Sequence, residues 1–159
     1  MGAETVRTIE TTGAAHTEAL GRAVGEVAEA GLYLALDGEL GGGKTTFVRG
    51  LAAGLGAASR VASPTFVIMR EYHGRLPLYH CDFYRLEHGG DIAELELETC
   101  LERGVVAAEW ASLFEPPRGA RVLAAHFEWT GDEARRITMT AHCERTRECL
   151  ASINLSFPQ

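Results

Sequence analysis

The apolar residues of this chain follow two spacings that alternate along the sequence. Where they recur every three or four residues, as at Leu20, Val24 and Val27, one face of an α-helix would be apolar. Where they form a short unbroken run, as in LYLALDG at residues 32–38, the pattern is typical of a strand buried on both faces. The helical spacing predicts helices over residues 13–30, 45–55 and 91–104. The strand patterns predict strands at residues 5–10, 32–38, 65–72, 77–84, 105–110, 120–129 and 135–143.

The order of these elements predicts one α/β domain. Buried strands that alternate with helices are typical of a mixed, mainly parallel sheet with flanking helices. The strands at 65–72 and 77–84 are joined by a tight connection, and the last two strands surround the turn TGDEA, so we expect antiparallel strands at the edges. The chain of 159 residues is expected to form a single domain over residues 1–150, followed by a C-terminal tail at 151–159.

Composition and charge exclude several classes of protein. The 15 Lys and Arg residues are outnumbered by 22 Asp and Glu, for a net charge of -7. Tight nucleic-acid binding needs clustered basic residues, so we do not expect it of this chain alone. No apolar run approaches the roughly 20 residues of a membrane-spanning helix, and no membrane association is expected. The four cysteines contain no C-x-x-C pair, which disfavours a zinc site and fits a reducing, cytoplasmic environment.

The stretch GELGGGKT at residues 38–45 carries the clearest chemistry. It matches the P-loop pattern G-x-x-x-x-G-K-[ST], with a buried strand before it and an amphipathic helix after it. The glycines let backbone N–H groups turn inward around phosphate, and the helix adds its positive N-terminal end. Lys44 would reach the β- and γ-phosphates, and the Thr45 hydroxyl would reach Mg²⁺. Lys44 is the only lysine beside fourteen arginines, which indicates that a compact ammonium is required here.

The scarcity of side-chain amides narrows the choice of nucleotide. The only asparagine is Asn154 and the only glutamine is Gln159. The Asn-Lys-x-Asp signature that reads guanine is therefore absent, as is a Ras-type glutamine that orients the attacking water. ATP is the expected nucleotide, and an acid or a histidine would have to handle the water.

Two stretches supply acids at strand positions. Strand periodicity places His80, Asp82 and Tyr84 on one face of the strand at 77–84. Glu109 ends a buried strand, where P-loop proteins hold the acid that binds Mg²⁺. Simpler readings are a solvated strand-end glutamate, an aspartate that caps a helix, and a structural histidine, so His80 is not placed among the catalytic residues. Thr65 in SPTF lies either in a nucleotide-sensing switch segment or in a plain connector.

Taken together, these stretches resemble the bacterial TsaE (YjeE) family. The resemblance runs from about residue 31 to 110, through the P-loop, VASPTFVIMREY, LYHCDFYRLE, ELELE and GVVAAEW. It implies a P-loop ATPase of tRNA threonylcarbamoyladenosine biosynthesis, the modification of the adenosine beside the anticodon. It also implies a single P-loop domain that binds ATP and Mg²⁺ and works with the transferase TsaD and its scaffold TsaB. The tRNA would be reached indirectly, through that complex.

The resemblance assigns roles to residues by motif. Phosphate contacts are implied for Gly41, Gly42, Gly43, Lys44, Thr45 and Thr46. Thr45 and Glu109 would hold Mg²⁺, while Lys44, Glu109 and Asp82 would form the catalytic set, with Asp82 positioning or activating water. Thr65 and Trp110 would lie beside the nucleotide, and Arg135 is a candidate for the adenine end. The family usually reads Asp-Leu-Gly-Ala-Gly-Lys-Thr, so Glu39 and Gly42 are departures from its pattern. The pair after Trp110 also departs from it, and no role is assigned there.

Two other functions remain open from the residues. A small-molecule kinase could use the same P-loop, but such kinases usually carry an Arg-rich lid, and no such segment stands out. A nucleotide-binding regulatory module with negligible hydrolysis would need the same loop without the acids. The presence of Asp82 and Glu109 weighs against that module.

Overall fold

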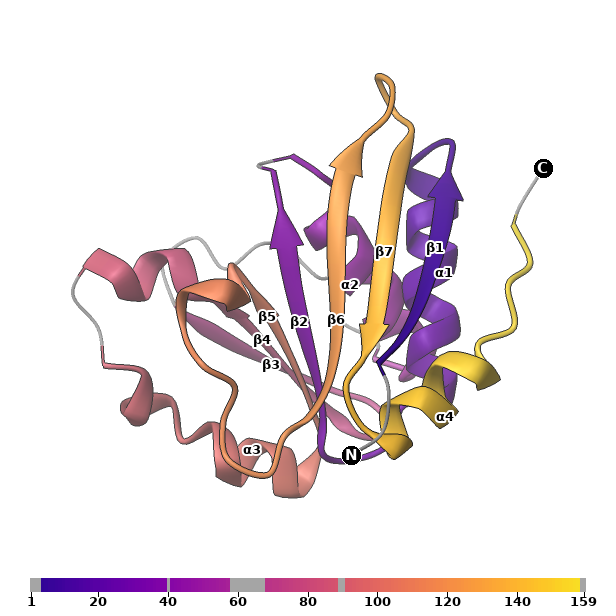
Figure 1. Ribbon diagram of the computed structural model, residues 1–159. Helices are drawn as coiled ribbons and strands as arrows, with labels where there is room; N and C mark the ends of the chain where they lie inside the picture. Colours follow the sequence, from indigo (N-terminus) through magenta and orange to yellow (C-terminus); the bar gives the residue numbers. More distant parts are fainter. Residues whose placement is uncertain (1–3, 40, 58–67, 89–90, 158–159) are drawn as a thin grey trace.

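The core of the protein is a single twisted sheet (Figure 1). The computed structural model describes residues 4–39, 41–57, 68–88 and 91–157, and within them the sheet has seven strands. They are β1 (Thr5–Thr11), β2 (Leu32–Gly38), β3 (Met69–His73), β4 (Pro77–Asp82), β5 (Val105–Glu109), β6 (Arg121–Trp129) and β7 (Arg135–Ala141). The α-helices are α1 (Ala14–Val27), α2 (Lys44–Gly54), α3 (Leu97–Arg103) and α4 (Glu144–Ser152). Short 3₁₀ helices are η1 (Phe83–His88), η2 (Ile92–Leu95) and η3 (Ala111–Leu113).

The sheet is parallel in its centre and antiparallel at both edges. Its strand order is β1-β7-β6-β2-β5-β4-β3. The pairs β4/β5, β5/β2 and β2/β6 are parallel, whereas β1/β7, β6/β7 and β3/β4 are antiparallel. The predicted α/β fold class, with a mainly parallel sheet and antiparallel edges, is therefore confirmed. The parallel strands β2, β4 and β5 have their carboxyl ends side by side at the same end of the sheet, which is where α/β proteins bind their ligands.

Several element boundaries differ from the prediction. β4 ends at Asp82, and the chain turns into η1 at Phe83, so the prediction that Tyr84 shares a strand face with Asp82 is wrong. The helix predicted over 91–104 is divided, because Glu96 adopts a left-handed conformation with φ 51° between η2 and α3. That break lets apolar residues on both sides of Glu96 pack into one core. Of the predicted strand 65–72, residues 65–67 lie outside the described part.

The C-terminal helix α4 was not predicted. Only Thr146 and Leu150 of its nine residues are buried, which is too few to produce a helical spacing. The boundary expected at residue 150 lies inside this helix. Beyond it, Ile153 is buried in the same core as Leu150, and Phe157 packs against that core and stacks on the ring of His16.

Helices α1 and α2 cover one face of the sheet, and their backbones touch directly. A Cβ added at Gly21 would lie 2.0 Å from the carbonyl oxygen of Phe47, and one at Gly50 would lie 1.9 Å from that of Glu18. Only glycine allows helices to approach this closely. The contact fixes the start of α2, and with it the glycine loop, relative to α1. The other face is covered by α3 and the 3₁₀ helices over a smaller core.

Candidate functional site

A cavity of about 460 Å³ opens at the carboxyl ends of the central strands. Gly41, Gly42 and Gly43 of the glycine loop (residues 38–45) form its floor together with the start of α2. Its walls come from the ends of β4 and β5, the start of α1 and the turn between β6 and β7. The lining residues are Ala14, Thr17, Gly41, Gly42, Gly43, Lys44, Thr45, Thr46, Asp82, Glu109, Trp110, Asp132, Glu133 and Arg135. All the residues proposed from the sequence line this cavity except Thr65, which lies outside the described residues.

The glycines of the loop are required by its backbone. Gly41 and Gly43 have φ of 75° and 101°, in the left-handed region that glycine tolerates best. The N–H of Gly42 donates to the carbonyl of Glu39 at 2.9 Å. A Cβ at Gly42 would come within 2.8 Å of that same oxygen, so the departure from Ala to Gly at this position suits the loop.

Lys44 is buried at the base of the cavity. It is 4% exposed, and its Nζ donates to the carbonyl of Gly38 at 2.8 Å. The ammonium also lies 4.3 Å from the centroid of the Trp110 ring, a cation–π contact. Burial lowers the pKa of Lys44, while the carboxylates of Glu109, Asp37 and Asp82 act in the opposite direction. The chain's single lysine is thus held between a carbonyl and an aromatic face, beside acids.

Glu109 is the meeting point of two strands and the P-loop helix. It is 6% exposed, and its carboxylate accepts the Thr45 hydroxyl, with Oγ1 at 3.3 Å from Oε1 and 3.4 Å from Oε2. The imidazole Nε2 of His80 lies 2.5 Å from Oε2. Thr45 and Glu109 were expected to share a metal ion, and the structure brings the two side chains into contact. The hydrogen bond between His80 and Glu109 was not expected.

Asp82 lines the cavity beside Glu109. It pairs with Glu109 in the register of β4 and β5, and Oδ1 accepts the N–H of Tyr84 at 3.1 Å, so it also caps the turn into η1. Burial raises the pKa of Asp82, and the Glu109 carboxylate adds to that rise. The Tyr84 N–H, Arg85 and His80 oppose it. Asp82 is therefore a carboxyl group whose proton is held more tightly than usual.

The turn after β5 is tied to the end of β2. Trp110 has φ 60°, and its ring packs between Lys44 and the exposed ring of Tyr84, whose centroid is 5.3 Å away. Asp37 accepts both the N–H and the hydroxyl of Ser112, at 3.1 and 2.8 Å. No role was expected of Ser112, because the pair of residues after Trp110 departs from the family pattern. The two hydrogen bonds fix the segment that carries Trp110.

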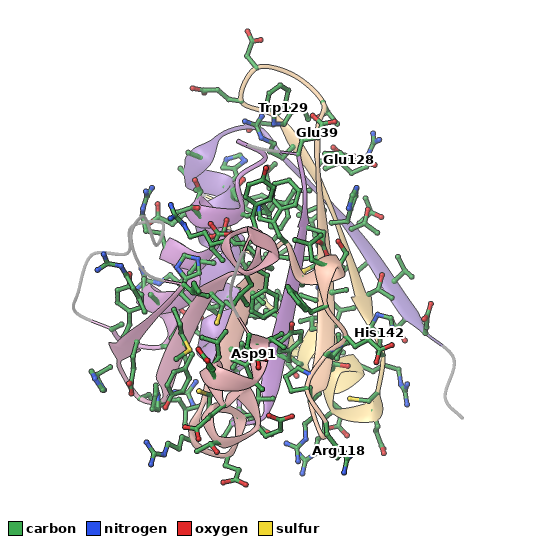
Figure 2. The ribbon with its side chains drawn as sticks, turned by 90° about the vertical axis from the view of Figure 1, so that its left-hand side faces the viewer. Glu39, Asp91, Arg118, Glu128, Trp129 and His142 are labelled. Atoms are coloured by element: carbon green, nitrogen blue, oxygen red, sulfur yellow. The ribbon has the colours of Figure 1, made fainter. Side chains whose placement is uncertain are left out.

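Side chains of the hairpin formed by β6 and β7 donate hydrogen bonds to Gly41 of the glycine loop. The carbonyl of Gly41 accepts hydrogen bonds from Trp129 Nε1 and Arg135 Nη2, both at 3.3 Å. Figure 2 shows Trp129 at the same end of the molecule as Glu39 of the loop. Arg135 lines the cavity as expected, but its Nη1 donates to backbone carbonyls of its own turn. Trp129 was missed, because nothing in its sequence surroundings distinguishes it from a strand residue.

Comparison with known proteins identifies the family to which this site belongs. The model of the family described as "Threonylcarbamoyl adenosine biosynthesis protein TsaE" matches residues 11–139. This chain belongs to the TsaE family. The TsaE protein of Bacillus subtilis strain 168 is 43% identical over 126 residues, 79% of each chain. That of Streptomyces coelicolor is 42% identical over 136 residues, 79% of this chain and 90% of the relative.

The fold also matches that of a solved structure over almost the whole chain. The crystal structure of YdiB from Bacillus subtilis has a TM-score of 0.79 and 33% sequence identity, and the match covers 96% of this chain and 97% of that one. The sequence resemblance to TsaE is therefore confirmed. Among the described residues, no helix is long and apolar enough to cross a membrane.

Proposed function

We propose that this protein acts in tRNA threonylcarbamoyladenosine biosynthesis as a Mg²⁺-dependent ATPase. The printed names of its TsaE relatives support the pathway. The observation that carries the ATPase is the convergence of buried Lys44 with the carboxylates of Asp82 and Glu109 on one cavity. Catalysis of phosphoryl transfer consists mainly of positioning and charge stabilisation, which these groups can supply.

The glycine loop suits a chain of phosphates. Gly41, Gly42 and Gly43 bring no side chain to the cavity floor, and α2 begins there, so the N-terminal end of the helix dipole favours an anion. Lys44 supplies the one side-chain ammonium, and a phosphate would replace the Gly38 carbonyl as its acceptor. The cavity of about 460 Å³ falls within the usual size of small-molecule sites, roughly 300–1,000 Å³.

Thr45 and Glu109 suit a magnesium ion that arrives with the nucleotide. Mg²⁺ prefers oxygen ligands and is commonly bound by one or two carboxylates together with substrate phosphates and water. Within the described residues, no group of three or more His, Cys, Asp and Glu could hold a metal by itself. The hydroxyl and carboxylate pair therefore fits shared coordination with phosphate oxygens. When bound, the ion would neutralise charge on the phosphates.

Three further residues that line the cavity, Asp82, Trp110 and Arg135, have roles beyond binding phosphate and metal in this proposal. Asp82, which lines the cavity, would hold the water that attacks the terminal phosphate, and Trp110, whose ring contacts Lys44, would shield the ammonium from solvent. The turn that carries Arg135 borders the end of the cavity where the base would lie. The protein works with TsaD and TsaB and reaches tRNA through them, which agrees with a net charge of -7.

The decisive measurement is ADP release with and without the TsaB–TsaD pair. We expect slow ATP hydrolysis by the protein alone, faster hydrolysis with the pair, and none of the phosphoryl transfer to small-molecule acceptors that a kinase would show. Lys44→Ala should lose at least about 100-fold in turnover, because the charge on the phosphates loses its closest cation.

The matched control is Arg118→Ala, which removes an exposed cation from the opposite end of the molecule to Trp129 (Figure 2). It should hydrolyse ATP at the wild-type rate. Full hydrolysis by Lys44→Ala would contradict the assignment of the P-loop as the site of ATP hydrolysis. An ATPase rate that TsaB–TsaD leaves unchanged would contradict the proposed partnership.

A further inference from the structure

His80 is a fully buried histidine beneath the site. It lies on β4 opposite Ala107 of β5, two residues before the pair formed by Asp82 and Glu109, and its side chain is 0% exposed. The strand alternation turns it toward the side of the sheet that α1 and α2 cover, together with Leu78. Leu78 and Ala107, which lie beside it on that face, are apolar core residues, so a buried polar side chain here requires a specific partner.

That partner is Glu109. The distance of 2.5 Å between His80 Nε2 and Glu109 Oε2 is a short hydrogen bond. Since a carboxylate can only accept, Nε2 carries the proton and donates it. Among the described residues, Nδ1 of the same ring has no hydrogen-bond partner, so the ring's one polar contact within them is with Glu109.

The hydrogen bond sets the orientation of the Glu109 carboxylate. A glutamate has three rotatable bonds, and the Thr45 hydroxyl is shared between its two oxygens at 3.3 and 3.4 Å, which leaves rotation about the last bond poorly defined. The contact from His80 to Oε2 breaks that symmetry. One oxygen is tied to β4, and the other is directed toward Thr45 and the cavity.

We infer that His80 is a positioning residue that presents Glu109, together with Thr45, to the metal ion of a metal–nucleotide complex. The inference rests on the proposed function, since it needs a nucleotide and a divalent ion at this site. Outer partners of metal-binding side chains typically change metal affinity by about 10- to 100-fold when they are removed. His80 would act through Glu109 without touching the nucleotide.

Three substitutions separate this role from packing. His80→Gln keeps an N–H donor near the position of Nε2, His80→Asn places its donor near Nδ1 and too far from Glu109, and His80→Leu removes the donor. The probe is Mn²⁺, whose binding to the ADP-loaded protein is followed by electron paramagnetic resonance. His126→Leu, which removes an exposed histidine on β6 that lies 3.8 Å from Glu128, is the matched control.

We expect His80→Leu and His80→Asn to bind Mn²⁺ at least about 10-fold more weakly than wild type. The Gln variant should remain within about threefold of wild type, as should His126→Leu, and metal-free ADP affinity should stay unchanged throughout. Wild-type Mn²⁺ affinity in folded His80→Leu would overturn the inference. Equal losses of ADP and Mn²⁺ binding, or a Gln variant as weak as Leu, would overturn it as well. Absence of Mn²⁺ binding by the ADP-loaded wild type would instead overturn the proposed metal–nucleotide site itself.

A measurement on the wild type covers the case in which the variants do not fold. In protein labelled with ¹⁵N at histidine, the His80 ring should carry its proton on Nε2, and that resonance should shift when Mg²⁺ is added to the ADP-bound protein. An unprotonated Nε2, or a resonance that Mg²⁺ leaves in place, would overturn the inference.

Discussion

The two halves of the candidate site are held in place by different means. The phosphate half, the glycine loop and the start of α2, is positioned mainly by a backbone contact, because α1 packs directly on α2, and the Trp129 and Arg135 side chains add hydrogen bonds to the Gly41 carbonyl. The acid half, Asp82 and Glu109, is positioned by side-chain hydrogen bonds at the ends of two adjacent strands. Backbone contacts are inseparable from the fold, whereas side-chain contacts can be removed singly. Changes to the helix contact should therefore cost stability, whereas the removal of a single side-chain contact at the site should mainly cost binding or activity.

The largest expected effect is on stability, at the contact of α1 with α2. Gly50→Ala would place a methyl group 1.9 Å from the Glu18 carbonyl oxygen, so the helices must separate. We expect the free energy of unfolding to fall by about 3 kcal/mol, at the upper end of overpacking effects. Chemical denaturation measures it. The control is Gly131→Ala, where a Cβ would meet only the Cβ of Ala134 at 3.4 Å. Equal stability of the two variants would mean that this helix contact does not fix the phosphate half.

The next effect, on hydrolysis, tests the acid half. Asp82→Ala should slow ATP turnover by about 100-fold, the low end of what a positioned acid or base contributes, while ADP affinity stays within about threefold of wild type. Single-turnover hydrolysis and ADP titration measure the two quantities. Glu71→Ala, at an exposed position of the neighbouring β3, is the control and should change neither. If Asp82→Ala turned over ATP normally, Asp82 would serve only to cap η1 through the Tyr84 N–H.

The same division explains what could be read from the sequence. The strand, the glycines, the lysine and the helix of the phosphate half follow one another directly in the chain. Each of its residues could therefore be identified from the sequence motif alone. Glu109 was found because it ends a predicted buried strand, and Asp82 because it stands in the stretch LYHCDFYRLE that resembles the TsaE family. The partnership of His80 with Glu109, separated by 29 positions, and the hydrogen bonds from Trp129 to Gly41 depend on which strands lie side by side. Local spacing carries no information on that order. The short helix α4 was missed for another reason, because it buries too few residues to leave a pattern.

A smaller effect is expected where the hairpin supports the glycine loop. Trp129 is 54% exposed, so Trp129→Ala should change stability by less than about 0.5 kcal/mol. It removes a donor to the Gly41 carbonyl, and ADP should bind about fivefold more weakly, which corresponds to one ordinary hydrogen bond of about 1 kcal/mol. Val6→Ala, at an exposed position of β1, is the control and should leave ADP binding unchanged. Wild-type ADP affinity in Trp129→Ala would show that backbone packing alone shapes the loop.

The smallest expected effect is on the pH dependence of stability. Because burial raises the pKa of Asp82, the folded state binds its proton more tightly than the unfolded chain does. The ionised carboxylate therefore costs stability above the folded pKa, and that cost disappears as the pH falls through it. Replacement by Asn removes this contribution, so Asp82→Asn should be slightly more stable than wild type near neutral pH and lose that advantage on acidification. Paired thermal unfolding of the two proteins from neutral pH down to the ordinary range of Asp titration measures the difference. A constant difference across that range would mean that the Tyr84 N–H and Arg85 offset the burial of Asp82 completely.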